Sequence, residues 1–149
     1  MPVRPYTDAD WPEWLRMSLA LFASESQHES PDEIERGMRG TRANANAAVL
    51  IAVRDDGSAC GFVEVGERSY AEGCESSPVA YVEAWYVDPD VRRRGLGRAL
   101  LAAAEDWARA RGHVEIASDA LLDNVLSHRA HVGSGYTEVE RIVVFRKSL

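Results

Sequence analysis

The segment VDPDVRRRGLGRALL, residues 87 to 101, constrains the fold more than any other part of this sequence. It follows an apolar run, Val79 to Val87, that has the length and composition of a strand. It leads into an amphipathic stretch, about Leu96 to Arg111, which predicts a helix ended by Gly112. The first amides of a helix have no internal acceptor and carry partial positive charge, so this order predicts an anion site at the helix start.

The turn between strand and helix has the pattern Arg92-x-x-Gly95-x-Gly97. The two glycines leave the backbone open to an anion and permit positive φ. Arginine side chains can fork onto phosphate oxygens, so the turn predicts a cradle for a diphosphate. It lacks the Gly-Lys-Ser/Thr ending of a nucleoside triphosphatase loop and the three-glycine dinucleotide fingerprint. A solvated basic loop that caps a helix is the alternative interpretation.

The rest of the chain predicts a mixed α/β sandwich with helices on both sides of a sheet. Three helices are expected besides Leu96 to Arg111: one capped by Thr7 and reaching Phe22, one from the cap Ser30-Pro31-Asp32-Glu33 to near Gly40, and a short one ending near Val132. Expected strands, besides Val79 to Val87, are Met1 to Pro5, Ala47 to Arg54, Ala59 to Glu67, Val114 to Ser118, and two final strands around Val139 to Arg146.

Composition bounds the class of protein. The chain has 149 residues, 46% of them hydrophobic, enough for one domain with a real core. Its net charge of −7 argues against a general nucleic-acid binder; it favours a cationic partner, or simply keeps a small protein soluble.

The longest apolar run, Ala47 to Val53, is far short of a membrane span, and no apolar signal segment opens the chain. Cys60 and Cys74 have no disulfide or metal-site spacing, which predicts reduced thiols, a cytoplasmic location and no metal.

Two blocks of the sequence together resemble a known family. Val87-Asp88-Pro89 followed by Arg92-x-x-Gly95-x-Gly97 resembles the acetyl-CoA signature of the GCN5-related N-acetyltransferases (GNAT), and Asn124-x-x-Ser127-x-x-x-His131-x-x-x-Gly135-Tyr136 resembles their second block. The resemblance covers essentially the whole chain, and implies a single N-acetyltransferase domain over residues 1–149. It implies the GNAT fold: a mixed, mostly antiparallel central sheet, helices on both faces, and a splayed cofactor cleft between the fourth and fifth strands.

The resemblance also implies how acetyl-CoA is bound. Backbone groups of the fourth strand would pair with the pantetheine arm, and one of these amides would hold the thioester oxygen. Amides and arginines of the turn would take the pyrophosphate, and an asparagine would bind the far end of the cofactor. The cofactor-binding residues expected on this basis are Trp85, Tyr86, Val87, Arg92, Arg93, Arg94, Gly95, Leu96, Gly97, Arg98 and Asn124.

A narrower resemblance concerns the acceptor. The blocks Gly73-Cys74-Glu75-Ser76-Ser77-Pro78, Val82-Glu83, Ala117-Ser118-Asp119, Glu140-Arg141 and Arg146-Lys147 are similar to those of small bacterial aminoglycoside 6′-N-acetyltransferases, which confer antibiotic resistance. This resemblance implies drug contacts at Phe22, Tyr70, Glu83, Asp119 and Glu140. Phe22 stands where those relatives tend to have tryptophan. The same relatives are commonly homodimers, and we expect one here by analogy.

The chemistry of the acidic residues agrees with a polycationic acceptor. Glu83 lies in an apolar strand, where an unpaired carboxylate would be costly, and Asp119 follows the end of a neighbouring strand, where sites of open sheets occur. Several carboxylates in one cleft would complement several ammonium groups. Glu64, Glu67, Glu72 and Glu75 are expected to add to an acidic loop before the fourth strand. The alternatives are a structural ion pair for Glu83, a helix N-cap for Asp119, and a surface pair with Arg141 for Glu140.

A reaction follows from such an acceptor. An ammonium must lose a proton before it attacks a thioester; Glu83 is our first choice of acceptor for that proton and Asp119 the second. His131 occupies the position where many acetyltransferases have a tyrosine that protonates the thiolate, although a packed helix histidine is equally consistent with the sequence. Two other functions stay open: an acetyltransferase of the same fold that acts on a peptide, polyamine or metabolite, and a non-catalytic CoA-binding domain.

Overall fold

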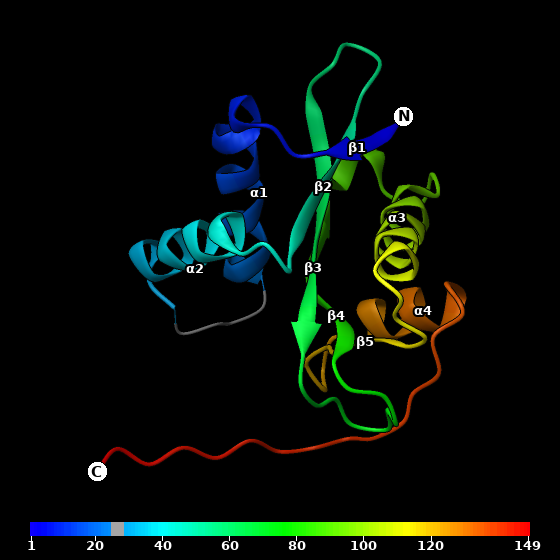
Figure 1. The fold of residues 1–149 in the computed structure, drawn as a ribbon. Helices are drawn as coiled ribbons and strands as arrows, with labels where there is room; N and C mark the ends of the chain where they lie inside the picture. The colour runs from blue at the N-terminus through cyan, green and yellow to red at the C-terminus, as the bar shows by residue number, and fades with distance from the viewer. Residues whose placement is uncertain (25–28) are drawn as a thin grey trace.

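The structure is a computed structural model that describes residues 1–24 and 29–149. Five strands form one sheet in the order β1-β2-β3-β4-β5; the first four are antiparallel neighbours, and β5 runs parallel to β4 (Figure 1). Helices α1 and α2 lie on one face, and α3 and α4 on the other (Figure 1). The elements are β1 (Val3–Pro5), the 3-10 turn η1 (Asp8–Asp10), α1 (Trp11–Ser24), α2 (Pro31–Ala43), β2 (Ala48–Val53), β3 (Ala59–Arg68), β4 (Val79–Val87), the 3-10 turn η2 (Pro89–Val91), α3 (Leu96–Ala110), β5 (Ile116–Ser118) and α4 (Val125–Gly133).

The core has two layers because the sheet is covered on both faces. Neighbouring residues of a strand point to opposite faces, so Phe62 packs with Trp14 and Met17 under α1 while Val63 packs with Leu100 under α3. All of these side chains are fully buried. Burial on both faces explains why β2, β3 and β4 have almost continuous apolar sequences.

The fourth strand has the bounds predicted from the sequence, and it parts from its neighbour halfway along. Its parallel pairing with β5 covers only Ala80 to Val82, opposite Ile116 to Ser118. Beyond that point β4 continues to Val87 with β3 on one side and no strand on the other in the part of the chain that the structure describes. The splaying of β4 from β5 that the resemblance implies is therefore present, and the opening between the two strands is called the cleft below.

The prediction of two final strands around Val139 to Arg146 is wrong for this structure. Residues 137–149 form an extended segment that leaves the body after α4 and pairs with no strand among the described residues (Figure 1). Its side chains are exposed, including Val144 and Phe145. A strand needs a partner edge for its backbone groups, and the path of this tail brings none alongside it.

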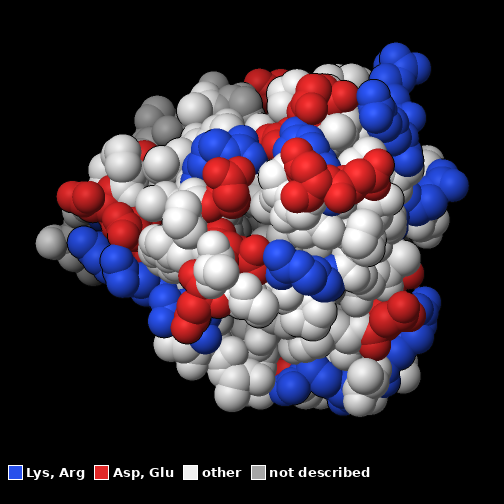
Figure 2. All heavy atoms as spheres, turned by 90° about the horizontal axis from the view of Figure 1, so that it is seen from above, with Lys and Arg blue, Asp and Glu red and all other residues white. Residues whose placement is uncertain are grey.

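Charge is mixed over the surface seen from above, where acidic and basic side chains lie side by side rather than in separate patches (Figure 2). Within residues 1–24 and 29–149, no helix combines the length and the apolar character that crossing a bilayer requires.

Candidate active site

The opening between β4 and β5 begins at two carboxylates. The last parallel pair is Val82 with Ser118, so Glu83 and Asp119 are the next residue on each strand. Glu83 is also the extra residue of a β-bulge, because Val65 pairs with Val82 and Glu64 with Ala84, which leaves Glu83 unpaired. A bulge re-aims the side chain that it carries, so strand geometry itself places two predicted acceptor residues at the mouth of the cleft.

Asp119 is held by a tyrosine of the neighbouring strand. The hydroxyl of Tyr81 donates a hydrogen bond to Asp119 Oδ2 over 2.6 Å. Burial raises the pKa of Tyr81, and its bond to Asp119 raises it further, so the phenol stays protonated and remains a donor. The alternative role for Asp119, capping the following helix, is wrong: Asn124 caps α4, its Oδ1 accepting from the Ser127 amide over 3.2 Å.

Glu83 forms an ion pair, as its alternative interpretation proposed. Arg68, the last residue of β3, donates from Nε to Glu83 Oε1 over 2.8 Å and from Nη2 to Oε2 over 2.6 Å. The position of Glu83 in an apolar strand implies a buried carboxylate. That implication is wrong, because the Glu83 side chain is 38% exposed. The bulge turns it to the surface, where a ligand can reach it.

Glu64 is a buried carboxylate. The sequence analysis expected it to contribute to an acidic loop before the fourth strand, and that expectation is wrong. Glu64 lies inside β3, its side chain covered by α1 and α2. Trp14 Nε1 donates to its Oε1 over 3.1 Å, and its Oε2 lies 3.4 Å from Thr41 Oγ1. Burial raises the pKa of Glu64 to about 7, and the charge of Glu83 adds to the rise. The sequence signal was present: Glu64 stands between Val63 and Val65 in an apolar run.

The turn before α3 has the backbone that an anion site needs. Gly95 adopts a left-handed conformation with φ 83°, and the space where its Cβ would lie is empty to 4 Å. Arg93 is also left-handed, with φ 64°. The Ala99 amide bonds the Gly95 carbonyl over 3.0 Å, so the amides of residues 96–98 precede the first helical hydrogen bond. These free amides and the open glycine fit a diphosphate.

Gly97 has a packing role in addition to the predicted one in cofactor binding. A Cβ at this position would lie 2.8 Å from Cζ2 of Trp85, so glycine is what lets α3 pack directly on the β4 tryptophan. The helix start is thereby held close to the strand edge where β4 and β5 diverge.

The arginines of the turn divide into two pairs. Arg92 Nε donates to the Val87 carbonyl over 2.8 Å, and Arg98 Nη2 donates to the Gly133 carbonyl over 2.5 Å, at the end of α4. Arg93 and Arg94 are exposed and have no ion-pair partner among the described residues. The second pair is therefore free to meet an anionic ligand.

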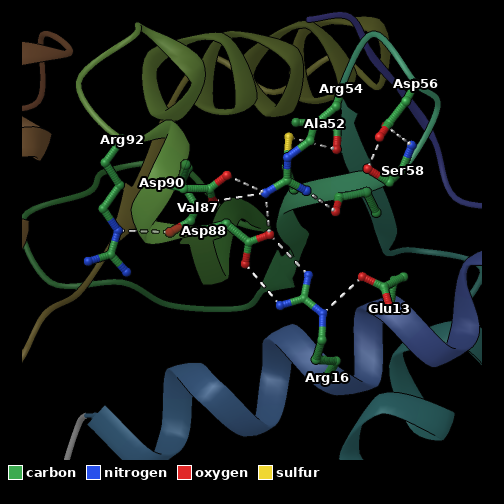
Figure 3. A network of polar contacts seen from close by, with 12 residues as sticks. Glu13, Arg16, Ala52, Arg54, Asp56, Ser58, Val87, Asp88, Asp90 and Arg92 are labelled. Atoms are coloured by element: carbon green, nitrogen blue, oxygen red, sulfur yellow. Dashed lines mark hydrogen bonds and ion pairs between the residues drawn. The ribbon is translucent and has the colours of Figure 1, made fainter.

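Asp88 anchors the same turn to the body of the protein (Figure 3). It is buried and accepts two hydrogen bonds from Arg16 of α1, both 3.0 Å, and one from Arg54 over 3.1 Å. Arg54 also binds Asp90 over 2.9 Å. Burial acts to raise the pKa of Asp88, but the two guanidinium groups outweigh it and the pKa lies below its ordinary value. Asp88 of the Val-Asp-Pro sequence is thus a structural clamp that fixes the start of the turn before α3.

His131 lies on the α3 side of the cleft and is engaged at both ring nitrogens. Its Nδ1 lies 2.8 Å from the Ser127 carbonyl, which only accepts, so Nδ1 carries the proton. Nε2 then accepts from the Ser118 hydroxyl over 2.8 Å. The ring also packs edge-on against Trp85 and Tyr136. For His131 to protonate a thiolate through Ser118, Nε2 would first have to gain a proton and donate to the Ser118 hydroxyl, whose own proton would pass to the sulfur.

Three predicted drug contacts are not brought to this cluster. Phe22 packs, partly buried, against the core under α1 and α2. Tyr70 is 67% exposed on the loop after β3, and Glu140 lies in the extended tail, next to Val139 where the tail contacts Gly73. Among residues 1–24 and 29–149 no three His, Cys, Asp or Glu side chains group as a metal site would need, and Cys60 and Cys74 are free thiols.

A left-handed glycine turn at a helix start lies beside a strand edge that pairs with no strand among the described residues, and carboxylates stand where the strands part. This arrangement suits an acyltransferase that uses a coenzyme A thioester. The sequence matches the Acetyltransferase (GNAT) family over residues 8–136. This chain belongs to the GNAT family.

Relatives with known names are similar over the whole length. The aminoglycoside N(6′)-acetyltransferase type 1 of Klebsiella aerogenes is 48% identical over 147 residues, which are 99% of this chain and 96% of that protein. Among solved structures, the apo aminoglycoside 6′-N-acetyltransferase AAC(6′)-IG of Acinetobacter haemolyticus has a TM-score of 0.89 at 35% identity, covering 100% of this chain and 99% of its own. AAC(6′)-Iy in complex with the bisubstrate analog CoA-S-monomethyl-acetylneamine has a TM-score of 0.89 at 30% identity, covering 99% and 98%.

Proposed function

We propose that this protein transfers the acetyl group of acetyl-CoA to the 6′-amino group of aminoglycoside antibiotics and thereby confers resistance to them. The observation that carries the proposal is the position of Glu83 and Asp119, side by side after the last β4–β5 pair. A polycationic acceptor is attracted by such a pair of carboxylates. The names of the relatives, at up to 48% identity, support the same substrate class.

Acetyl-CoA fits the residues of the cleft. The amides of residues 96–98 and the space over Gly95 would take its diphosphate, with Arg93 and Arg94 adding charge. Beyond Val82 the β4 backbone pairs with no strand on its β5 side among the described residues, and its stretch from Trp85 to Val87 would pair there with the pantetheine arm. The bound thioester supplies the electrophilic acetyl carbon. Arg92, Leu96 and Asn124 complete the set of residues that we assign to cofactor binding, with Arg98 bracing the turn against α4.

The protein's own groups provide the proton transfers. An acceptor ammonium that docks at the mouth of the cleft must give up a proton, and we assign that proton to Glu83, the exposed carboxylate of the bulge. Asp119, oriented by Tyr81, would hold a second ammonium and serve as the second choice of base. We keep His131 as the group that would return a proton to the thiolate: Nε2, once protonated from solvent, would donate to the Ser118 hydroxyl, and that hydroxyl would pass its own proton to the sulfur. Phe22 and Tyr70, which the structure does not bring to the two carboxylates, stay predicted drug contacts.

We also propose that the protein is a homodimer in which the tails are exchanged. The tail, residues 137–149, carries exposed Val143, Val144 and Phe145, apolar area that a second copy would cover. The outer edge of β5 has no partner among the described residues and would accept a strand. Pairing there would carry Glu140 toward the edge beside Asp119, where it could contact the drug.

The chain would then act as a single N-acetyltransferase domain in the cytoplasm, where Cys60 and Cys74 stay reduced.

The test is release of CoA thiol under saturating acetyl-CoA over a panel of amines. Kanamycin and tobramycin, which carry a 6′-amino group, should be turned over, and analogues with a 6′-hydroxyl should not. Turnover of spermidine or a peptide in place of the drugs would support an acetyltransferase of another amine. Binding of acetyl-CoA without turnover of any amine would favour a non-catalytic CoA-binding domain.

A further inference from the structure

The strongest cation–carboxylate contact at the mouth of the cleft is made within the chain, by Arg68. Its guanidinium uses two nitrogens for the two oxygens of Glu83, at 2.8 and 2.6 Å. This two-point geometry is the preferred one for a guanidinium on a carboxylate. The predicted proton acceptor of the reaction is therefore already bound to a cation when no acceptor is present.

The same guanidinium lies over the ring of Tyr81, whose hydroxyl donates a hydrogen bond to the second carboxylate, Asp119. Arg68 Cζ is 3.6 Å from the centre of the Tyr81 ring, and the Tyr81 hydroxyl donates to Asp119 over 2.6 Å. The hydrogen bonds of Glu83 raise the pKa of Arg68 above its ordinary value, and the charges of Glu83 and Asp119 contribute. A carboxylate, an aromatic face and a second carboxylate nearby are the surroundings by which proteins bind an ammonium ligand.

The pair is placed where a ligand can compete for it. The side chains of Arg68 and Glu83 are 43% and 38% exposed. Exposed ion pairs contribute little to stability, so a ligand that brings its own cations can open this one at small cost.

We propose that Arg68 occupies the subsite of an acceptor ammonium in the ligand-free enzyme, and that the acceptor binds by displacing it from Glu83. Arg68 is then a specificity-determining residue. A polycation gains contacts with several carboxylates and displaces the guanidinium, whereas a monocation gains one contact and meets the repulsion of Arg68. This inference rests on the proposed function, because it assumes a polycationic acceptor.

The test compares Arg68→Gln with the wild-type protein by titration calorimetry, with the protein saturated with CoA. The probes are kanamycin, a polycation, and 6-amino-6-deoxyglucose, a monocation with an equivalent amino group. The variant should bind kanamycin about 1.5-fold to fivefold more tightly, the size expected from removing one exposed ion pair. Binding of the monocation should improve by a larger factor, so that discrimination between the two probes falls.

The matched control is Arg109→Gln, which makes the same change in net charge on the exposed face of α3, where Arg109 pairs with Glu105 and Asp106. It should leave both affinities unchanged. Arg68→Lys keeps the charge without the two-point geometry and should fall between wild type and Arg68→Gln, which gives a second test if the glutamine variant is unstable.

Two results would overturn the inference. If Arg68→Gln binds both probes no more tightly than Arg109→Gln, the guanidinium does not compete with the acceptor. If the affinities stay the same and kcat falls, Arg68 instead positions Glu83. Failure of the proposed function gives a different pattern, in which neither wild type nor Arg68→Gln binds kanamycin; binding by the variant alone would support the inference.

Discussion

Glu83 and Asp119 are neighbours across two parallel strands at the residue where those strands separate, because Val82 and Ser118 form the last pair. The bulge on β4 lies at the same position, so the exposed carboxylate of Glu83 stands where β4 and β5 separate.

The first prediction separates the two carboxylates by kinetics. Glu83→Gln should lower kcat by roughly 10²- to 10⁴-fold, the usual contribution of a general base. Asp119→Asn keeps an acceptor for the Tyr81 hydroxyl but loses the charge, so it should mainly raise KM for the drug, by about tenfold. Asp106→Asn, on the exposed face of α3, is the control and should behave like wild type. Near-normal kcat in Glu83→Gln would remove Glu83 from the proton transfer.

The second prediction concerns the contact between α3 and β4. Gly97→Ala places a Cβ against Trp85 and should destabilise the protein by about 1–3 kcal/mol, since overpacking forces the helix start to move. The KM for acetyl-CoA should rise, because the free amides of residues 96–98 move with it. Gly40→Ala is the matched control: it lies in α2 with open space around it and should be neutral or slightly stabilising. Unchanged stability and acetyl-CoA KM in Gly97→Ala would contradict the packing role.

The third prediction uses the buried carboxyl of Glu64. Its folded-state pKa of about 7 lies above the ordinary value of 4.5, so the folded chain keeps a proton that the unfolded chain loses. Stability should therefore fall as pH rises from 4.5 to 7, by about 3 kcal/mol in total, and this loss should persist above pH 7.

Glu64→Gln should remove that part of the pH dependence, because a neutral amide can still accept from Trp14 and donate to Thr41. Urea unfolding of both proteins at pH 5, 6, 7 and 8 measures the difference. The stability of the variant relative to wild type should rise from pH 5 to pH 8; parallel curves over the whole range would show that Glu64 titrates normally.

The fourth prediction tests the clamp at the turn. Asp88→Asn leaves Arg16 and Arg54 without their shared buried carboxylate and should cost about 3 kcal/mol of stability. Asp90→Asn removes an exposed partner of the same Arg54 and should cost less than about 1 kcal/mol. Equal effects in denaturant unfolding would show that burial does not matter at this clamp.

The fifth prediction addresses the tail, residues 137–149. The full chain should sediment at twice the 16.5 kDa mass of one chain, and removal of the tail should give a monomer. Phe145→Asn should weaken the dimer, whereas Ser148→Asn should not, since both residues are exposed in one copy but only Phe145 is apolar. A monomeric full-length protein would exclude tail exchange.

Sequence patterns predicted the strands and helices whose signals are local. The apolar run from Val79 to Val87 forms β4 with the predicted bounds. The Ser30 cap followed by Pro31 marks the start of α2, as predicted. The glycine turn before α3 also has the predicted left-handed backbone at Gly95.

Features that depend on distant residues could not be predicted in the same way. The apolar neighbours of Glu64 indicate burial, but its partner Trp14 is 50 residues away, and nothing near Glu64 in the sequence shows that α1 covers it. The apolar residues of the tail, 137–149, predicted two strands. In the structure the tail pairs with no strand edge among the described residues, so these strands do not form. The Arg68–Glu83 pair depends on the bulge, which changes which side chains share a face.

The most direct test of the central claim is the product formed from kanamycin and acetyl-CoA by the wild-type enzyme, identified by NMR. The account predicts a single product acetylated on the 6′-amino group, and its loss in Glu83→Gln. Acetylation at another amino group, or an undiminished rate in that variant, would contradict the claim that the carboxylates at the β4–β5 opening receive the acceptor.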